Sequence, residues 1–233
     1  MDNMLSKEEI SAIVNGDHSN VFSLLGIHRN KGTKKIFIRV YQPFASAIEV
    51  IDGKGESLGK MEKIDERGFF QKNFDKTEEF AYRFKITNDK GHEYMAEDTY
   101  SFPSTIGDID EYLFAQGNHR EIYKKLGSHI MEINGVKGVA FAVWAPNAKR
   151  VSVIGSFNNW DGRIDVMRKH INCGVWDIFI PGLVEGEYYK FEIKTQDGRI
   201  LTKSDPVGTY AEVRPNTASI VYDINHYQWN DGE

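Results

Sequence analysis

The chain has 233 residues, enough for one large domain or for two domains of about 100 residues each. Its net charge of −5, with acidic and basic residues interspersed, argues against a nucleic-acid groove, and no apolar run is long enough to cross a bilayer. The single cysteine, Cys173, excludes an internal disulfide, and the N-terminal segment lacks the apolar run of a signal peptide. We therefore expect a cytoplasmic protein with no nucleic-acid and no membrane partner.

The first element along the chain is a short N-terminal helix. Ser6 and Glu9 have the spacing of a capping box, Leu5 and Ile10 can form a hydrophobic staple, and Gly16 can end the helix.

Strand patterning fills most of the remaining sequence. In KIFIRVYQP (35–43) the side chains alternate between two faces, and Gly, Asp and Asn interrupt the runs at sandwich-like intervals. Trp144 and Trp176 each lie in such a run, so we expect both in the core. The other expected strands are SAIEVID, GFFQKNF and YRFKITND in the first half, and VAFAVWAP, RVSVIGSF, VWDIFIPG, YYKFEIKT, RILTKS and ASIVYD in the second.

Two helical stretches, DIDEYLFAQG (108–117) and NHREIYKKLG (118–127), separate the two strand-rich halves. The halves themselves match in order: RVYQPFASAIEVID is echoed by AVWAPNAKRVSVIG, and YRFKITNDKG by YKFEIKTQDG, just over 100 residues later. The sequence therefore predicts an all-β protein of two immunoglobulin-like β-sandwich domains in tandem. We expect these domains at 1–103 and 127–224, joined by a short helical linker at 104–126.

The stretch SFNNWDG (156–162) places a tryptophan in a turn. The first half has DGKGESLG at the corresponding place, so the repeated scaffold does not need Trp160. An exposed indole among Asn, Asp and Lys suits a sugar ring, whose C–H face packs on the aromatic ring while its hydroxyls bind polar groups. The alternative is local core packing of Trp160.

Other kinds of site lack a sequence signal. There is no phosphate-binding glycine loop, no Cys or His pair at metal-ligand spacing and no nucleophile elbow. None of the acidic residues lies in a recognisable catalytic context. We expect no catalytic residue, no metal and no cofactor in this chain.

Several motifs resemble one known family. NVFSLLGIH, VWAPNAKRVSVIGSFNNWDG, GVWDIFIPG, YYKFEI, KSDP and RPNTASIVYD, from about Ser6 to Tyr222, are similar to the amino-terminal part of the bacterial glycogen (1,4-alpha-glucan) branching enzymes. The SFNNWDG region also resembles carbohydrate-binding modules of family 48. The resemblance implies an enzyme family that forms α-1,6 branches, in which these two β-domains precede a catalytic (β/α)₈ barrel.

No segment resembles the barrel's catalytic motifs, and a barrel needs about 250 residues. The resemblance thus implies a fragment that is inactive by itself, with residues 225–233 beginning the link to the absent barrel. Its expected partners are α-1,4-glucan, as in glycogen, and that barrel.

The resemblance also implies the binding residues. Trp160 and Lys190 match a tryptophan and a lysine that contact glucan in glycogen-binding members, and Asn158 and Asn159 could donate hydrogen bonds to sugar hydroxyls. A second tryptophan of those members is replaced here by Arg199, Ile200 and Leu201. Lys190 is equally explained as a solvated strand lysine, and the asparagines as turn formers.

Two other functions stay open on the sequence. The chain could be a structural domain pair that stabilises the barrel without sugar affinity, or a free-standing glycogen-targeting subunit.

Overall fold

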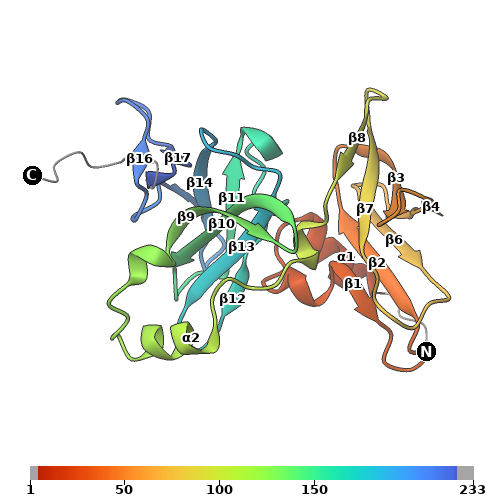
Figure 1. Ribbon diagram of the computed structural model, residues 1–233, viewed down its shortest axis with the longest axis horizontal. Coiled ribbons are helices and arrows are strands. Elements are labelled where there is room, and N and C mark those ends of the chain that lie inside the picture. The colour runs from red at the N-terminus through yellow and green to blue at the C-terminus, as the bar shows by residue number, and fades with distance from the viewer. Residues whose placement is uncertain (1–4, 225–233) are drawn as a thin grey trace, which may run out of the picture. The chain divides into compact units, whose positions relative to one another are not determined.

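The computed structural model describes residues 5–224 (Figure 1). It is all-β, with antiparallel sheets and short helices, which confirms the predicted fold class. The chain divides into two compact units, Met1–Phe102 and Pro103–Glu233, and each contains two sheets. Among the described residues, no helix has the length and apolar character that a membrane span requires.

The predicted N-terminal helix is α1, Lys7–Val14. Its capping box is formed as expected: the Glu9 backbone N–H donates to Ser6 Oγ (3.1 Å), and the Ser6 N–H donates to Glu9 Oε2 (2.8 Å). These bonds satisfy two N–H groups that a helix end would otherwise leave unpaired.

The first unit is a sandwich of two four-stranded sheets. Alternate residues of β2 and β3, including Ile38 and Val50, are fully buried between them, because a strand sends every second side chain to the same face. One sheet has the order β1 (Gly26–Arg29), β2 (Ile36–Tyr41), β6 (Phe69–Asn73), β5 (Glu62–Asp65); the other has the order β4 (Ser57–Lys60), β3 (Ala45–Asp52), β7 (Tyr82–Asn88), β8 (Glu93–Ala96).

The second unit repeats this plan. Phe141 of one sheet and Tyr189 of the other meet edge to face with ring centroids 4.8 Å apart, so the two sheets share a core. The first sheet has the order β12 (Arg168–His170), β13 (Val175–Pro181), β10 (Val136–Trp144), β9 (Gly127–Ile133). The second has the order β11 (Arg150–Gly155), β14 (Tyr188–Lys194), β17 (Ser219–Ile220), β16 (Tyr210–Ala211), with β15 (Ile200–Lys203) also paired to β14.

Matching contacts show that the repeat predicted from sequence is a structural one. The Tyr82 hydroxyl donates to the buried Asp98 carboxylate, and 107 residues later the Tyr189 hydroxyl donates to Asp205 Oδ2 (2.6 Å). The main difference lies after β3 and β11. The first unit continues into strand β4, whereas the second forms a loop that carries Trp160.

Only one of the two tryptophans expected in the core lies there. Trp176 is fully buried, but Trp144 is 59% exposed, so that part of the prediction is wrong. Trp144 lies on the face of β10 opposite Val139, Phe141 and Val143. Ala140 and Ala142 on that face are buried, but Trp144 is the last residue of the strand and is left exposed.

Residues 104–126 were expected to be a linker, and the structure places them in the second unit. They include α2 (Asp108–Ala115) and the 3₁₀ turn Ile122–Lys124. The buried Asp177 of β13 accepts hydrogen bonds from the Ser104 hydroxyl and the Thr105 N–H, both at 2.9 Å. These bonds tie the start of the segment to the sheet. The expected link at 225–233 lies outside the described residues.

Candidate functional site

The loop between β11 and β12 carries Trp160, and buried hydrogen bonds hold its first half. Asn158 is 4% exposed; its Oδ1 accepts from the Gly155 N–H (2.9 Å), while its Nδ2 donates to the Val153 carbonyl (2.8 Å) and to Asp165 Oδ2 (2.7 Å). Gly155 is required sterically, because a Cβ there would collide with the Phe157 ring and a backbone carbonyl. The loop therefore has one defined path out of β11.

Asp165 closes this network and has a perturbed acidity. Burial raises the pKa of its carboxyl to about 6, although the hydrogen bond from Asn158 lowers it. The Asp165 carboxyl has a structural role, since its hydrogen-bond partner, Asn158, belongs to the same loop.

The second half of the loop is held by a buried arginine. Arg150, 2% exposed, pairs with Glu192 Oε1 (2.5 Å) and donates to Ser152 Oγ (2.5 Å) and to the carbonyl of Gly162. The Ser152 hydroxyl donates to the same carbonyl (2.6 Å). The loop is thus anchored on both sides of Trp160.

Trp160 itself has an unusual backbone conformation. Its φ is +58°, and that of Asn159 is +56°, so two consecutive residues other than glycine lie in the left-handed region. This is uncommon for any L-residue and a true outlier for a bulky one. The conformation is fixed by the Trp160 N–H, which donates to the Gly155 carbonyl (2.8 Å). The indole remains 42% exposed, so the anchored loop presents it to solvent.

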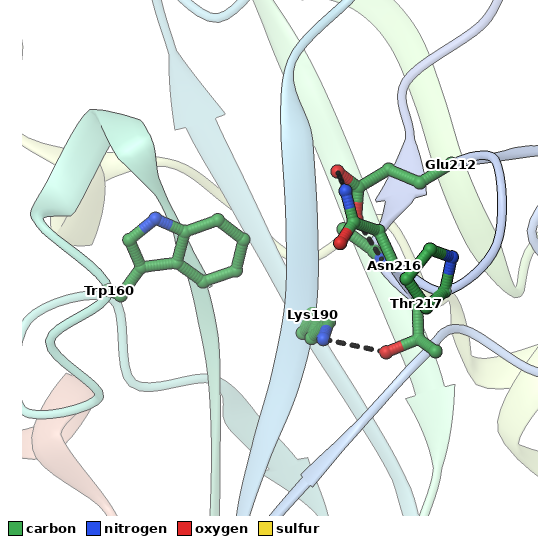
Figure 2. Close-up of a pocket in the computed structure, with 7 residues that line it drawn as sticks. Trp160, Lys190, Glu212, Asn216 and Thr217 are labelled. Carbon is green, nitrogen blue, oxygen red and sulfur yellow. Dashed lines mark hydrogen bonds between the residues drawn. The ribbon is translucent and has the colours of Figure 1, made fainter.

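The indole borders an open pocket of about 500 Å³ (Figure 2). Figure 2 shows the indole on one side of β14, Lys190 on that strand, and Glu212, Asn216 and Thr217 on the other side. The Lys190 ammonium donates to Thr217 Oγ1 (2.8 Å) and, with three N–H groups, has two more to offer.

The far wall of the pocket comes from the segment between β16 and β17. Glu212 Oε2 accepts from the Ala218 N–H (2.8 Å), and Glu212 Oε1 accepts from Asn216 Nδ2 (3.3 Å). A flat apolar face thus lies opposite an ammonium, a carboxylate, an amide and a hydroxyl, all within one pocket. Such a surface fits a ligand with an apolar face and a polar edge.

Of the four predicted binding residues, two line the pocket and two do not. Trp160 and Lys190 line the same pocket. Asn159 is exposed but is not among the pocket-lining residues. Asn158 differs most from the expectation, because burial and the three hydrogen bonds described above keep its amide from reaching a sugar. It positions the loop.

The pocket residues that the sequence analysis did not identify are the polar Glu212, Asn216 and Thr217, together with Pro215 and Ala218. They lie in RPNTASIVYD and just before it, a segment already noted for its resemblance to branching enzymes, so a signal was available. None of Arg199, Ile200 and Leu201 lines the pocket. Across residues 5–224, no group of three or more His, Cys, Asp or Glu side chains could hold a metal ion.

Family models match each unit of the chain. Residues 6–100 match the N-terminal domain of alpha-1,4-glucan branching enzyme GlgB. Residues 125–208 match carbohydrate-binding module 48, the isoamylase N-terminal domain. The second match includes Trp160 and Lys190 but ends before Glu212.

Curated relatives match along nearly the whole chain. A 1,4-alpha-glucan branching enzyme GlgB of Cereibacter sphaeroides is 43% identical over 98% of this chain and 31% of its own length. One of Rubrobacter xylanophilus is 45% identical over 99% of this chain and 31% of its own length. The chain thus spans about a third of these relatives. It belongs to the 1,4-alpha-glucan branching enzyme family as an N-terminal region that includes a family 48 carbohydrate-binding module.

Proposed function

We propose that the second unit binds α-1,4-glucan chains in the pocket between Trp160 and Lys190. The observation that carries this proposal is the indole, held in a left-handed backbone conformation and 42% exposed beside a polar wall. Strain of this kind is kept where the surrounding structure enforces it, and it concentrates at functional sites. The family 48 match and the names of the relatives supply the ligand class.

The expected affinity is low. One aromatic platform and a few hydrogen bonds should give a dissociation constant on the order of millimolar, equivalent to about 4 kcal/mol. A weak site is useful beside a catalytic domain that handles the same polymer, because the second contact is then intramolecular. We propose that the chain holds glucan for the α-1,6 branching reaction of such an enzyme and packs against its catalytic barrel, without catalysing the reaction itself.

Calorimetric titration with maltoheptaose tests the binding proposal. We expect Trp160→Ala to abolish measurable binding, because it removes the platform. Trp144→Ala is the matched control: Trp144 is also an exposed tryptophan of the second unit, but it does not line the pocket. It should bind maltoheptaose like the unchanged protein.

Two results would count against the proposal. Equal binding by Trp160→Ala and the unchanged protein would place any glucan elsewhere. Absence of binding by the unchanged protein, at concentrations well above millimolar, would favour a structural domain pair.

A further inference from the structure

A group of exposed tyrosines lies on the same face of the sheet as the Trp160 pocket. Tyr188, Tyr210 and Tyr222 are 43%, 54% and 41% exposed. The rings of Tyr210 and Tyr222 contact each other with centroids 5.4 Å apart. Large aromatic side chains grouped on a surface indicate a binding face. None of these three tyrosines lines the Trp160 pocket.

Strand register fixes which face they occupy. Tyr188 pairs with Ile220, and Ile220 pairs with Tyr210, so Tyr188, Ile220 and Tyr210 form one row across β14, β17 and β16. Tyr222 follows Ile220 by two residues, and its ring contacts that of Tyr210. Directly opposed residues of an antiparallel pair share a face. The neighbouring row, which includes Tyr189 and Ser219, is buried inside the sandwich. Tyr188 and Tyr210 therefore face outward on either side of the buried Ile220; we call these residues, with Tyr222, the tyrosine row.

The pocket occupies the next outward row. Lys190 follows Tyr188 by two residues and points to the same side. Glu212 follows Tyr210 by two residues, and its N–H donates to the Ala218 carbonyl (3.0 Å). The pocket row and the tyrosine row thus lie about 7 Å apart along the strands, close enough for one oligosaccharide chain to cross both.

We propose that Tyr188, Tyr210 and Tyr222 form a second aromatic platform that binds further glucose units of the glucan chain held at Trp160. This inference rests on the proposed function and extends it from a single platform to a track. A tyrosine suits this role because its ring offers a flat apolar face and its hydroxyl both donates and accepts hydrogen bonds. The site should therefore discriminate by chain length: maltose fills the pocket, whereas maltoheptaose reaches the tyrosines.

The test measures maltose and maltoheptaose affinities in parallel. Tyr188→Ala is the main variant, since Tyr210 and Tyr222 contact each other and their loss also alters the hairpin. We expect it to weaken maltoheptaose binding about tenfold, equivalent to ~1.4 kcal/mol, and to leave maltose binding unchanged. A longer glucan can bind the same site in several registers, which raises its apparent affinity without any new contact. Comparing each variant with the unchanged protein on the same ligand cancels this effect.

Two further variants serve as controls. Tyr188→Phe should keep most of the maltoheptaose affinity, because the ring remains. Tyr123→Ala removes a tyrosine that is 58% exposed, in the same unit but outside both rows, and should change neither affinity. A measurement on the unchanged protein avoids folding effects: maltoheptaose should slow nitration of Tyr188 by tetranitromethane, and maltose should not.

The outcomes separate this inference from the proposed function. If Trp160→Ala loses maltose while Tyr188→Ala keeps full maltoheptaose affinity, the pocket stands and the tyrosine platform is refuted. If Trp160→Ala binds maltose normally, the proposed function fails first. If Tyr188→Ala weakens both ligands equally, the tyrosine acts through the structure of the sheet, and the platform is also refuted.

Discussion

The left-handed conformation at Trp160 leads to an unusual stability prediction. Trp160→Ala and Trp160→Gly remove the same indole, so their difference reports the backbone alone. A left-handed conformation costs an L-residue roughly 1–2 kcal/mol, and glycine avoids this cost. Glycine also loses more conformational entropy on folding, by about 0.5–1 kcal/mol relative to alanine. The balance makes Trp160→Gly more stable than Trp160→Ala, by roughly 0.5–1 kcal/mol.

Urea unfolding measures this difference through the transition of the second unit. The first unit is unchanged in both variants, so its transition serves as an internal reference. Because the slope of the free energy with urea should be the same for both, the comparison reduces to a shift in midpoint. Neither variant should bind maltoheptaose, because both lack the indole. The greater stability of Trp160→Gly should therefore not restore binding.

Trp144 provides a matched control of opposite sign. It ends strand β10 and is not among the described residues with positive φ. Trp144→Gly should therefore be less stable than Trp144→Ala, by about 0.5–1 kcal/mol. If glycine is also the less stable replacement at position 160, the claim that the loop enforces a strained backbone there is refuted.

Three more predictions concern the pocket and its support. Lys190→Met keeps the aliphatic stem and should weaken maltoheptaose binding about tenfold (~1.4 kcal/mol) by calorimetry, because charged hydrogen bonds to the sugar are lost; unchanged affinity would make Lys190 a solvated strand lysine. Burial lifts the pKa of Asp165 from 3.8 to about 6, so its stabilising contribution is full below pH 4 and is lost as pH rises through 6. Asp165→Asn should therefore raise the unfolding free energy at pH 7 by about 1–3 kcal/mol and flatten this pH dependence; a lower value would show that the carboxylate is needed. Gly155→Ala should lower the free energy of unfolding by about 1–3 kcal/mol through overpacking and should abolish glucan binding. A variant that is fully stable and binds glucan would contradict the steric argument.

Regular features of the fold were predictable because they repeat local rules. The capping box at Ser6 depends on four neighbouring residues, and strand alternation predicted strands such as β2, β3 and β10, though not β1, β4, β9 or β12. The duplication was visible because each half must bury the same faces, and pairs such as Tyr82 and Tyr189 occupy equivalent places. Trp144 shows the limit: alternation locates a strand, but how far along the strand each face stays covered depends on packing by distant segments, such as that of Ile106 and Leu126 on Ala142.

The site was predictable only in part. Trp160 could be identified because it lies in a turn sequence, where a large apolar side chain is unexpected. Lys190 could be identified because it lies on a strand face that was expected to be exposed. Asn158 could not be assigned from sequence, since asparagine suits both a turn network and a sugar contact; only the buried positions of its three partners decide between them. Glu212 and Asn216 reach the pocket through the pairing of β16 with β17 and of β17 with β14, which is a nonlocal arrangement that periodicity does not reveal.

The two units differ in how the chain continues after β3 and after β11. In the first unit the chain after β3 forms strand β4, whose backbone groups pair with β3. In the second unit, Arg150 and Ser152 donate to the Gly162 carbonyl of the loop, and the chain returns to pair with β11 only at residues 165–167. Side-chain partners of this kind satisfy backbone groups in the part of the loop that lies outside the sheet. The buried polar residues around the loop therefore support the exposed, strained position of Trp160, in a connection longer than the one between β3 and β4 in the first unit.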